Sequence, residues 1–152
     1  MVRRRKTWRE KLEGVKEPRI VDDPRGRGRM LIPKPLDIEN LIRGVPCGGL
    51  VTVNQIRENL ARRFGVDLTC PLVTGLFIRI IAEAAEEDRR GGKTDITPYW
   101  RVIKVDGSLN PKFPGGVEAQ AERLRAEGHT IIEGKGGKLF VKDFETYLVR
   151  LP

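Results

Sequence analysis

The sequence contains few of the residues from which metal sites and disulfide scaffolds are built. Its 152 residues include two cysteines, Cys47 and Cys70, and one histidine, His129. A structural zinc site takes four such ligands, so this small set argues against one. Disulfide frameworks stabilise small secreted domains, whereas a chain of this length can bury a core of its own. We therefore expect a protein with neither a metal nor another cofactor.

Long apolar runs are also missing, and no stretch is long enough to span a bilayer. The basic start, Arg3 to Lys6, is followed by Trp8 and charged residues instead of the apolar segment of a secretory signal. These absences predict a cytoplasmic protein without a membrane partner. We also expect it to be a monomer.

Positive charge is abundant, and most of the surplus lies at the start of the chain. The formal net charge is +8, and residues 1–30 hold eleven cations against five carboxylates. This surplus favours either a polyanionic partner or a solubilising surface. We predict a basic N-terminal arm over residues 1–30, partly extended, and a globular domain over residues 31–152. The arm is either mobile or ordered by docking through Trp8 and Leu12.

Two amphipathic helices are predicted after the arm. Asp37 is a suitable N-cap for a short helix that ends at Gly44. Thr52 and Gln55 have the spacing of a capping box, which predicts a second helix that continues to Phe64.

A third helix is predicted from residues 69–71 to Asp88, because proline favours the first helical turn. Its expected buried stripe consists of Leu76, Phe77, Ile80, Ile81 and Ala84. Together with the preceding helix it forms either a helix-turn-helix or an ordinary packed pair. The small residues Thr74 and Gly75 suit close approach to a nucleic-acid groove or to another helix.

The last third of the chain favours short strands and two more helices. Residues 97–103 predict a strand, with a turn at Asp106-Gly107 and a return strand after it. A helix that ends at Gly128, a β-hairpin over residues 129–141 and a final helix capped by Asp143 follow. This mixture of elements predicts an α+β fold.

The order of these pieces resembles the DNA-binding domain of the O6-alkylguanine-DNA alkyltransferases. The resemblance covers about residues 37–128 and depends on Val51-Thr52, Gln55-Ile56, Thr74-Gly75, Pro98 with Arg101-Val102, Gly115-Gly116 and Glu127-Gly128. The chain is also similar over nearly its whole length to a small group of alkyltransferase-like proteins. The resemblance implies a winged helix-turn-helix-like fold, that of the alkyltransferase C-terminal domain, with small β-hairpins and a basic N-terminal arm.

The same resemblance implies that the family's reaction is lost. Tyr99 occupies the position of the reactive cysteine and Trp100 that of the histidine base, while Glu127 matches the glutamate that orients the histidine. A phenol has a pKa near 10 and an indole accepts no proton, so neither side chain replaces its counterpart. We expect no enzymatic activity at Tyr99.

The parts that rotate a base out of the duplex also differ. Leu72 stands where the family has its arginine finger, Val53 where it has a tyrosine, and Gly91 near the position of its asparagine hinge. Leu72 is either a wedge between bases or a packing residue. The aromatic ring of Tyr99 would allow a base to stack in a pocket without chemistry.

The predicted function is therefore non-catalytic nucleic-acid binding of the alkyltransferase-like type, with duplex DNA favoured over RNA and damaged or modified bases as candidate ligands. The predicted nucleic-acid contacts are Arg3, Arg4, Arg5, Lys6, Thr69, Leu72, Val73, Thr74, Gly75 and Arg101, and the predicted pocket is Val53, Tyr99, Trp100 and Glu127. The basic cluster of residues 3–6 is equally consistent with a solvated tail.

Two other functions remain open from the sequence. One is a scaffold that binds RNA, the ribosome, or a repair or ribosomal protein, with its lesion cleft plugged. The other is an alkyltransferase that uses Cys70, because a helix N-terminus favours a thiolate. A structural role for this cysteine is the competing reading.

Overall fold

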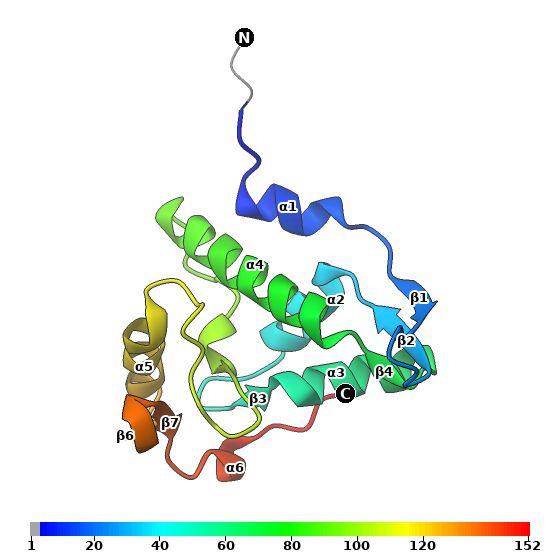
Figure 1. Ribbon diagram of the computed structural model, residues 1–152. Helices are drawn as coiled ribbons and strands as arrows, with labels where there is room; N and C mark the ends of the chain where they lie inside the picture. Colours follow the sequence, from blue (N-terminus) through cyan, green and yellow to red (C-terminus); the bar gives the residue numbers. More distant parts are fainter. Residues whose placement is uncertain (1–3) are drawn as a thin grey trace.

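The elements of the chain are short, apart from one central helix (Figure 1). The computed structural model describes residues 4–152, and its elements are α1 (Trp8–Gly14), β1 (Arg19–Asp22), β2 (Arg29–Ile32), α2 (Pro35–Arg43), β3 (Val51–Thr52), α3 (Val53–Phe64), β4 (Leu68–Thr69), α4 (Pro71–Arg90), the 3-10 helix η1 (Tyr99–Arg101), β5 (Val102–Ile103), α5 (Gly116–Ala126), β6 (Ile131–Glu133), the 3-10 helix η2 (Lys135–Gly137), β7 (Leu139–Val141) and α6 (Phe144–Tyr147).

The capping box at the start of α3 is confirmed. The Thr52 hydroxyl accepts from the Gln55 backbone N–H at 3.1 Å, and the Gln55 side chain accepts from the Thr52 N–H at 2.8 Å. Gly65 ends the helix in the left-handed conformation, at a φ of 64°, which favours glycine. Local sequence therefore determines both ends of α3.

Of two predicted helix caps, Asp37 is wrong and Asp143 is confirmed in its position but not as a side-chain cap. α2 begins at Pro35, and Lys34, not Asp37, is its N-cap residue. Proline is well suited to the first helical position because its φ is preset and it needs no N–H partner. Asp143 does precede α6, but it adopts a φ of 55° and its side chain caps nothing.

The buried face of α4 differs from the predicted stripe at one position. Phe77, Ile81 and Ala84 are buried as expected, but Leu76 is 52% exposed. The buried face includes Thr74 and Ile78 instead, and both α1 and α2 pack against α4.

Three small sheets surround the helices. In the first, β2 lies between β1, which is antiparallel to it, and β4, which is parallel. In the second, β3 and β5 pair in parallel, and in the third, β6 and β7 form the predicted antiparallel hairpin. The α+β prediction is confirmed.

The first 30 residues contain a docked helix and one strand of a hairpin. α1 packs on α4, and its Leu12 is fully buried. Glu87 of α4 accepts the backbone N–H groups of Trp8 and Arg9 at 3.1 and 3.2 Å, which satisfies free donors at the start of α1. Of the two predicted states for this segment, the structure shows the docked one.

The strand predicted over residues 97–103 is confirmed only at its last two residues, and the return strand predicted after Gly107 is not among the strands of residues 4–152. Tyr99–Arg101 form a 3-10 turn, and the two residues after it pair with β3. The three side chains of the turn bind Glu86, Glu127 and Val45, which lie on different parts of the fold. A strand would alternate its side chains between two faces and could not reach three sites. The turn at Gly107 is present, with a φ of 84°.

The core lies between α4, α2, α3 and α5. Its largest fully buried apolar side chains are Leu12, Leu31, Ile38, Ile42, Leu50, Ile56, Leu60, Ile78, Ile81, Ile103 and Leu124. Within residues 4–152, no helix is both long enough and apolar enough to cross a membrane.

Candidate nucleic-acid interface

The first two turns of α4 present apolar side chains to solvent. Leu72 is 81% exposed and Leu76, one helical turn later, is 52% exposed. Between them lies Gly75, where an added Cβ would meet nothing within 4 Å. The helix starts here because β4 is held on β2, with the Cys70 N–H donating to the Leu31 carbonyl at 2.9 Å. We call Leu72, Gly75 and Leu76 the wedge surface.

A hollow of about 430 Å³ opens on one side of the wedge surface. Its other lining residues are Val53, Pro71, Arg79, Lys104, Asn110, Pro111 and Lys112. Three of these are cations, and no carboxylate lines the hollow. An apolar surface beside such a hollow is suited to a flat aromatic group attached to a phosphate chain.

A second hollow, of about 300 Å³, lies on the other side of Leu72 and is lined by the loop between β1 and β2. Arg25 and Arg27 contribute to it. The Arg27 Nε donates to Asp23 at 2.5 Å, and this hydrogen bond lowers the pKa of Asp23 to about 2. Leu72 therefore stands between cations from two separate parts of the chain.

These flanking cations were missed by the sequence prediction. Arg25, Arg27, Arg79, Lys104 and Lys112 are spread over 88 residues and share no motif. Only the fold brings them to one surface, so no local pattern could have indicated them.

Three predicted contacts on the helix pair point away from the wedge surface. The Thr69 hydroxyl donates to the Arg57 carbonyl at 2.8 Å, and the Thr74 hydroxyl donates to the Cys70 carbonyl at 2.6 Å. Both threonines are at most 1% exposed. Val73 is partly buried against the core.

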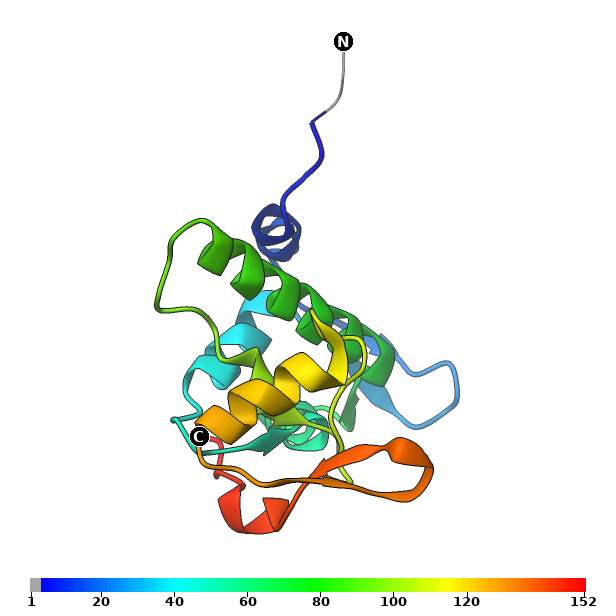
Figure 2. The same ribbon diagram turned by 90° about the vertical axis from the view of Figure 1, so that its left-hand side faces the viewer.

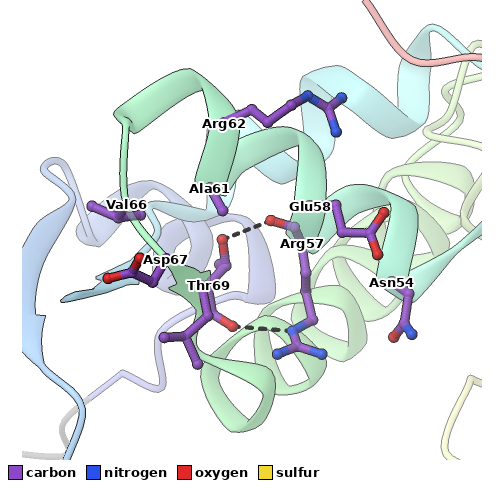
Figure 3. Close-up of a pocket in the computed structure, with 9 residues that line it drawn as sticks. Asn54, Arg57, Glu58, Ala61, Arg62, Val66, Asp67 and Thr69 are labelled. Carbon is purple, nitrogen blue, oxygen red and sulfur yellow. Dashed lines mark hydrogen bonds between the residues drawn. The ribbon is translucent and has the colours of Figure 1, made fainter. Parts of the chain in front are cut away.

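Thr69 instead lines a hollow of about 370 Å³ between α3 and β4 (Figure 3). Arg57 binds the Thr69 carbonyl through its Nε at 3.0 Å, so the two residues are joined twice. The charged side chains that line this hollow are two cations and two carboxylates, Arg57, Arg62, Glu58 and Asp67. Their charges balance, which makes it a poor site for a polyanion.

Glu127 accepts hydrogen bonds from three separate groups. It accepts from the Trp100 Nε1 at 2.8 Å, from the Arg101 Nη2 at 2.7 Å and from the Gly48 N–H at 3.3 Å. Burial opposes ionisation, but the hydrogen bonds from Arg101 and Trp100 outweigh it and lower the pKa of Glu127. The Glu127 carboxylate therefore joins the Trp100 indole to the Arg101 guanidinium.

Arg101 was predicted to contact nucleic acid, but its guanidinium is bound inside the protein. Besides Glu127 it donates to the Val45 carbonyl from Nη1 at 2.6 Å, and its side chain is 14% exposed. Its role in this structure is to hold η1 against α2 and α5.

Tyr99 is 2% exposed and its hydroxyl donates to Glu86 Oε2 at 2.7 Å. Burial, reinforced by this hydrogen bond to a carboxylate, raises the pKa of Tyr99 well above the usual value near 10. Its ring lies edge-on to Trp100 and Phe113, with centroids 5.3 and 5.2 Å apart. The phenol is therefore neutral and is held by its neighbours.

The four predicted pocket residues do not share one cavity. Val53 lines the hollow beside Leu72, whereas Tyr99 and Trp100 line two hollows at the other end of α4. Glu127 is enclosed by Trp100 and Arg101.

The basic cluster at the N-terminus also lies away from the wedge surface. Arg3 is outside the described residues, and Arg4, Arg5 and Lys6 are exposed. They precede the point where α1 contacts Glu87, which is 15 residues along α4 from Leu72. At 1.5 Å per residue this separation is about 22 Å. The cluster and Leu72 are near opposite ends of α4.

Cys70 is 9% exposed and lines the hollow that contains Arg25 and Arg27. His129 is 5% exposed, and neither of its nitrogens has a hydrogen-bond partner. Among residues 4–152, no group of three or more His, Cys, Asp or Glu side chains could hold a metal ion.

The helix pair, the small sheets and the Trp100–Glu127 contact together define a protein with the alkyltransferase DNA-binding fold. No protein-family model matches the sequence, and no curated protein matches it. Two solved structures do: S. pombe Atl1 in complex with damaged DNA containing O6-carboxymethylguanine, and S. pombe ATL in complex with DNA.

These two chains are 19% and 20% identical to this protein, with TM-scores of 0.53 and 0.55. Each match covers 76% of this chain and 93% of the other. The likeness confirms the fold that the sequence resemblance implied.

Proposed function

We propose that the protein is a non-catalytic nucleic-acid-binding protein that inserts Leu72 between the bases of duplex DNA. The exposure of Leu72 carries this proposal. A leucine that is 81% exposed at the start of a helix buries little apolar surface in the fold, and it lies between two hollows that contain cations. Proteins that bind the minor groove insert such apolar side chains between base steps. The shared fold with a protein crystallised on damaged DNA supports the choice of duplex DNA.

The surrounding charges support phosphate binding. Arg79, Lys104 and Lys112 on one side of Leu72 and Arg25 on the other would contact the two backbones that border a groove. Contacts of this kind release counterions, so binding would weaken steeply as salt is raised.

Recognition of a modified base would use the hollow beside Val53. This hollow is next to Leu72, and the Asn110 and Lys112 side chains on its rim offer hydrogen-bond donors to an exocyclic oxygen. Tyr99 lies elsewhere and is buried, so a lesion-specific site would be formed by Val53, Leu72 and Asn110.

The side chains in the family's catalytic positions support a role without chemistry. Tyr99 is a neutral hydrogen-bond donor to Glu86, and Trp100 uses its only polar hydrogen on Glu127. Neither supplies a nucleophile or a base. A mass increase on Cys70 after incubation with O6-methylguanine duplex would instead establish the transferase alternative.

The decisive experiment compares Leu72→Ala with the wild type by fluorescence anisotropy on a labelled duplex, plain or carrying O6-methylguanine. Burying a leucine side chain contributes about 1.5–3 kcal/mol, which corresponds to a loss of affinity of about 10- to 100-fold. Ile132→Ala, which removes a 44% exposed side chain on β6, is the matched control and should change affinity by less than about twofold. Unchanged binding by the Leu72 variant would contradict the proposal.

A scaffold that binds RNA or a protein is a second candidate. It is favoured by the burial of Tyr99 and by the hydrogen bond from its hydroxyl to Glu86, because these two side chains fill the region where the family's reactive residue would lie. It predicts tighter binding to structured RNA than to duplex DNA, with no effect of Leu72→Ala on that binding.

A further inference from the structure

A second basic surface lies at the C-terminal end of α4. Two hollows, of about 690 and 330 Å³, adjoin there and share Arg89 and Arg123 in their walls. The larger is also lined by Arg43 and Lys93, and the smaller by Arg90. We call these five cations the distal surface.

The cations of the distal surface outnumber the carboxylates that line its two hollows. Glu86 accepts from Arg89 at 2.6 Å and from Arg123 at 2.7 Å, so one carboxylate serves two guanidinium groups. Lys93 is 3.9 Å from Asp88, while Arg43 and Arg90 form no ion pair with any residue from 4 to 152. The remaining acidic lining consists of Asp95 and Glu122. Two cations are thus free to bind an anion from solution.

Helix dipoles account for only part of this cluster. Arg43 and Arg89-Arg90 are in the last turns of α2 and α4, where the carbonyl ends of a helix favour cations. Lys93 comes from a loop and Arg123 from α5, and both still face the same hollows. Convergence of four elements on a concave surface concentrates positive potential there.

The distal surface is far from the wedge surface. Arg90 follows Leu72 by 18 residues of continuous helix, which is about 27 Å. Residues 4–7 leave the molecule near the same end of α4, as Figures 1 and 2 show from two directions. The exposed Arg5 and Lys6 therefore add to the charge at this end.

We propose that the distal surface binds the phosphate backbone of a second nucleic-acid segment, so that one molecule bridges two duplexes. This inference rests on the proposed binding of a first duplex at the wedge surface. Guanidinium groups bind phosphate oxygens in pairs through parallel N–H donors, and four of the five cations are arginines. Two sites about 27 Å apart and on opposite ends of a helix leave each duplex room to approach.

The experiment immobilises one biotinylated duplex on beads, loads the protein, and measures capture of a second, fluorescent duplex. The distal variant combines Arg43→Gln, Arg90→Gln and Lys93→Gln. The matched control removes three exposed cations elsewhere, through Lys16→Gln, Arg63→Gln and Lys142→Gln. Affinity for a single short duplex is measured in parallel by anisotropy.

We expect the wild type and the control to capture the second duplex, and we expect the distal variant to capture at least about tenfold less of it. The affinity of the distal variant for a single duplex should stay within about threefold of the wild-type value. No capture by a wild type that binds single duplexes, or equal capture by the distal variant, would overturn bridging and leave the proposed function intact. Absence of single-duplex binding would overturn the proposed function itself. If polyglutamate of equal charge displaces the second duplex as well as competitor DNA does, the nucleic-acid assignment is overturned.

Discussion

Removing the Glu127 carboxylate should destabilise the protein strongly, because this group holds a buried cation. The side chains of Glu127 and Arg101 are 10% and 14% exposed, and they are joined at 2.7 Å. Removing one partner of a buried pair costs about 3–5 kcal/mol, since the other charge is left without compensation. Arg101 keeps the Val45 carbonyl as a partner, so we expect Glu127→Ala to cost about 3 kcal/mol, at the lower end of this range.

Urea denaturation followed by tryptophan fluorescence measures this loss. Glu122→Ala, an exposed carboxylate on the same helix, is the control and should change the free energy of unfolding by less than about 0.5 kcal/mol. A double variant with Arg101→Met should lose less than the sum of the two single variants, because neither charge is then left unpaired. A loss below about 1 kcal/mol for Glu127→Ala would show that Arg101 is solvated and refute the reasoning.

The pH dependence of stability gives an independent check on Glu127. Its pKa is lowered in the folded state, so its contribution is complete above the unfolded value near 4.3 and is lost as the pH falls through the folded value. The wild type should therefore lose stability on acidification below pH 5 more steeply than Glu127→Ala. Parallel curves would show that the carboxylate does not stabilise the folded state.

Two further predictions concern other buried groups. Burial lowers the pKa of His129, so the free energy of unfolding should fall as the pH drops below about 6.5, with a slope of at most about 1.4 kcal/mol per pH unit. In urea titrations from pH 7.5 to 5.5, His129→Phe should flatten this slope. An unchanged slope would exclude His129 as its source. Leu12→Ala should cost about 2–5 kcal/mol in urea denaturation, because this side chain is fully buried against α4. Val15→Ala, at a 37% exposed position, is its control, and an equally small loss for both would mean that α1 contributes nothing to folding.

Elements with strong local patterns were predicted well. The capping box of Thr52 and Gln55, the end of that helix after Phe64 and the hairpin of β6 and β7 depend on residues a few positions apart. Their geometry is determined by backbone hydrogen bonds and allowed dihedral angles within one segment. The resemblance to the alkyltransferases likewise predicted the fold, because it rested on an ordered series of motifs along the chain and not on any single one.

The errors occurred where distant contacts override local preference. Residues 99–101 have the composition of a strand, yet their bonds to Glu86, Glu127 and Val45 impose a 3-10 turn. Leu76 follows a helical apolar pattern, but the fold leaves its side chain 52% exposed. Periodicity gives the spacing of a helical face and does not say which part of that face the fold will cover.

The sequence by itself determined most of the helices, the end of α3 at Gly65 and the surplus of positive charge. Only the tertiary structure decided where the charge acts. Within residues 4–30, the basic residues before α1 and those of the β1–β2 loop lie toward opposite ends of α4, because α1 docks at Glu87 while the loop containing Arg25 lies beside Leu72. A helix of 20 residues keeps these ends about 30 Å apart, so charges that are near in sequence serve separate surfaces.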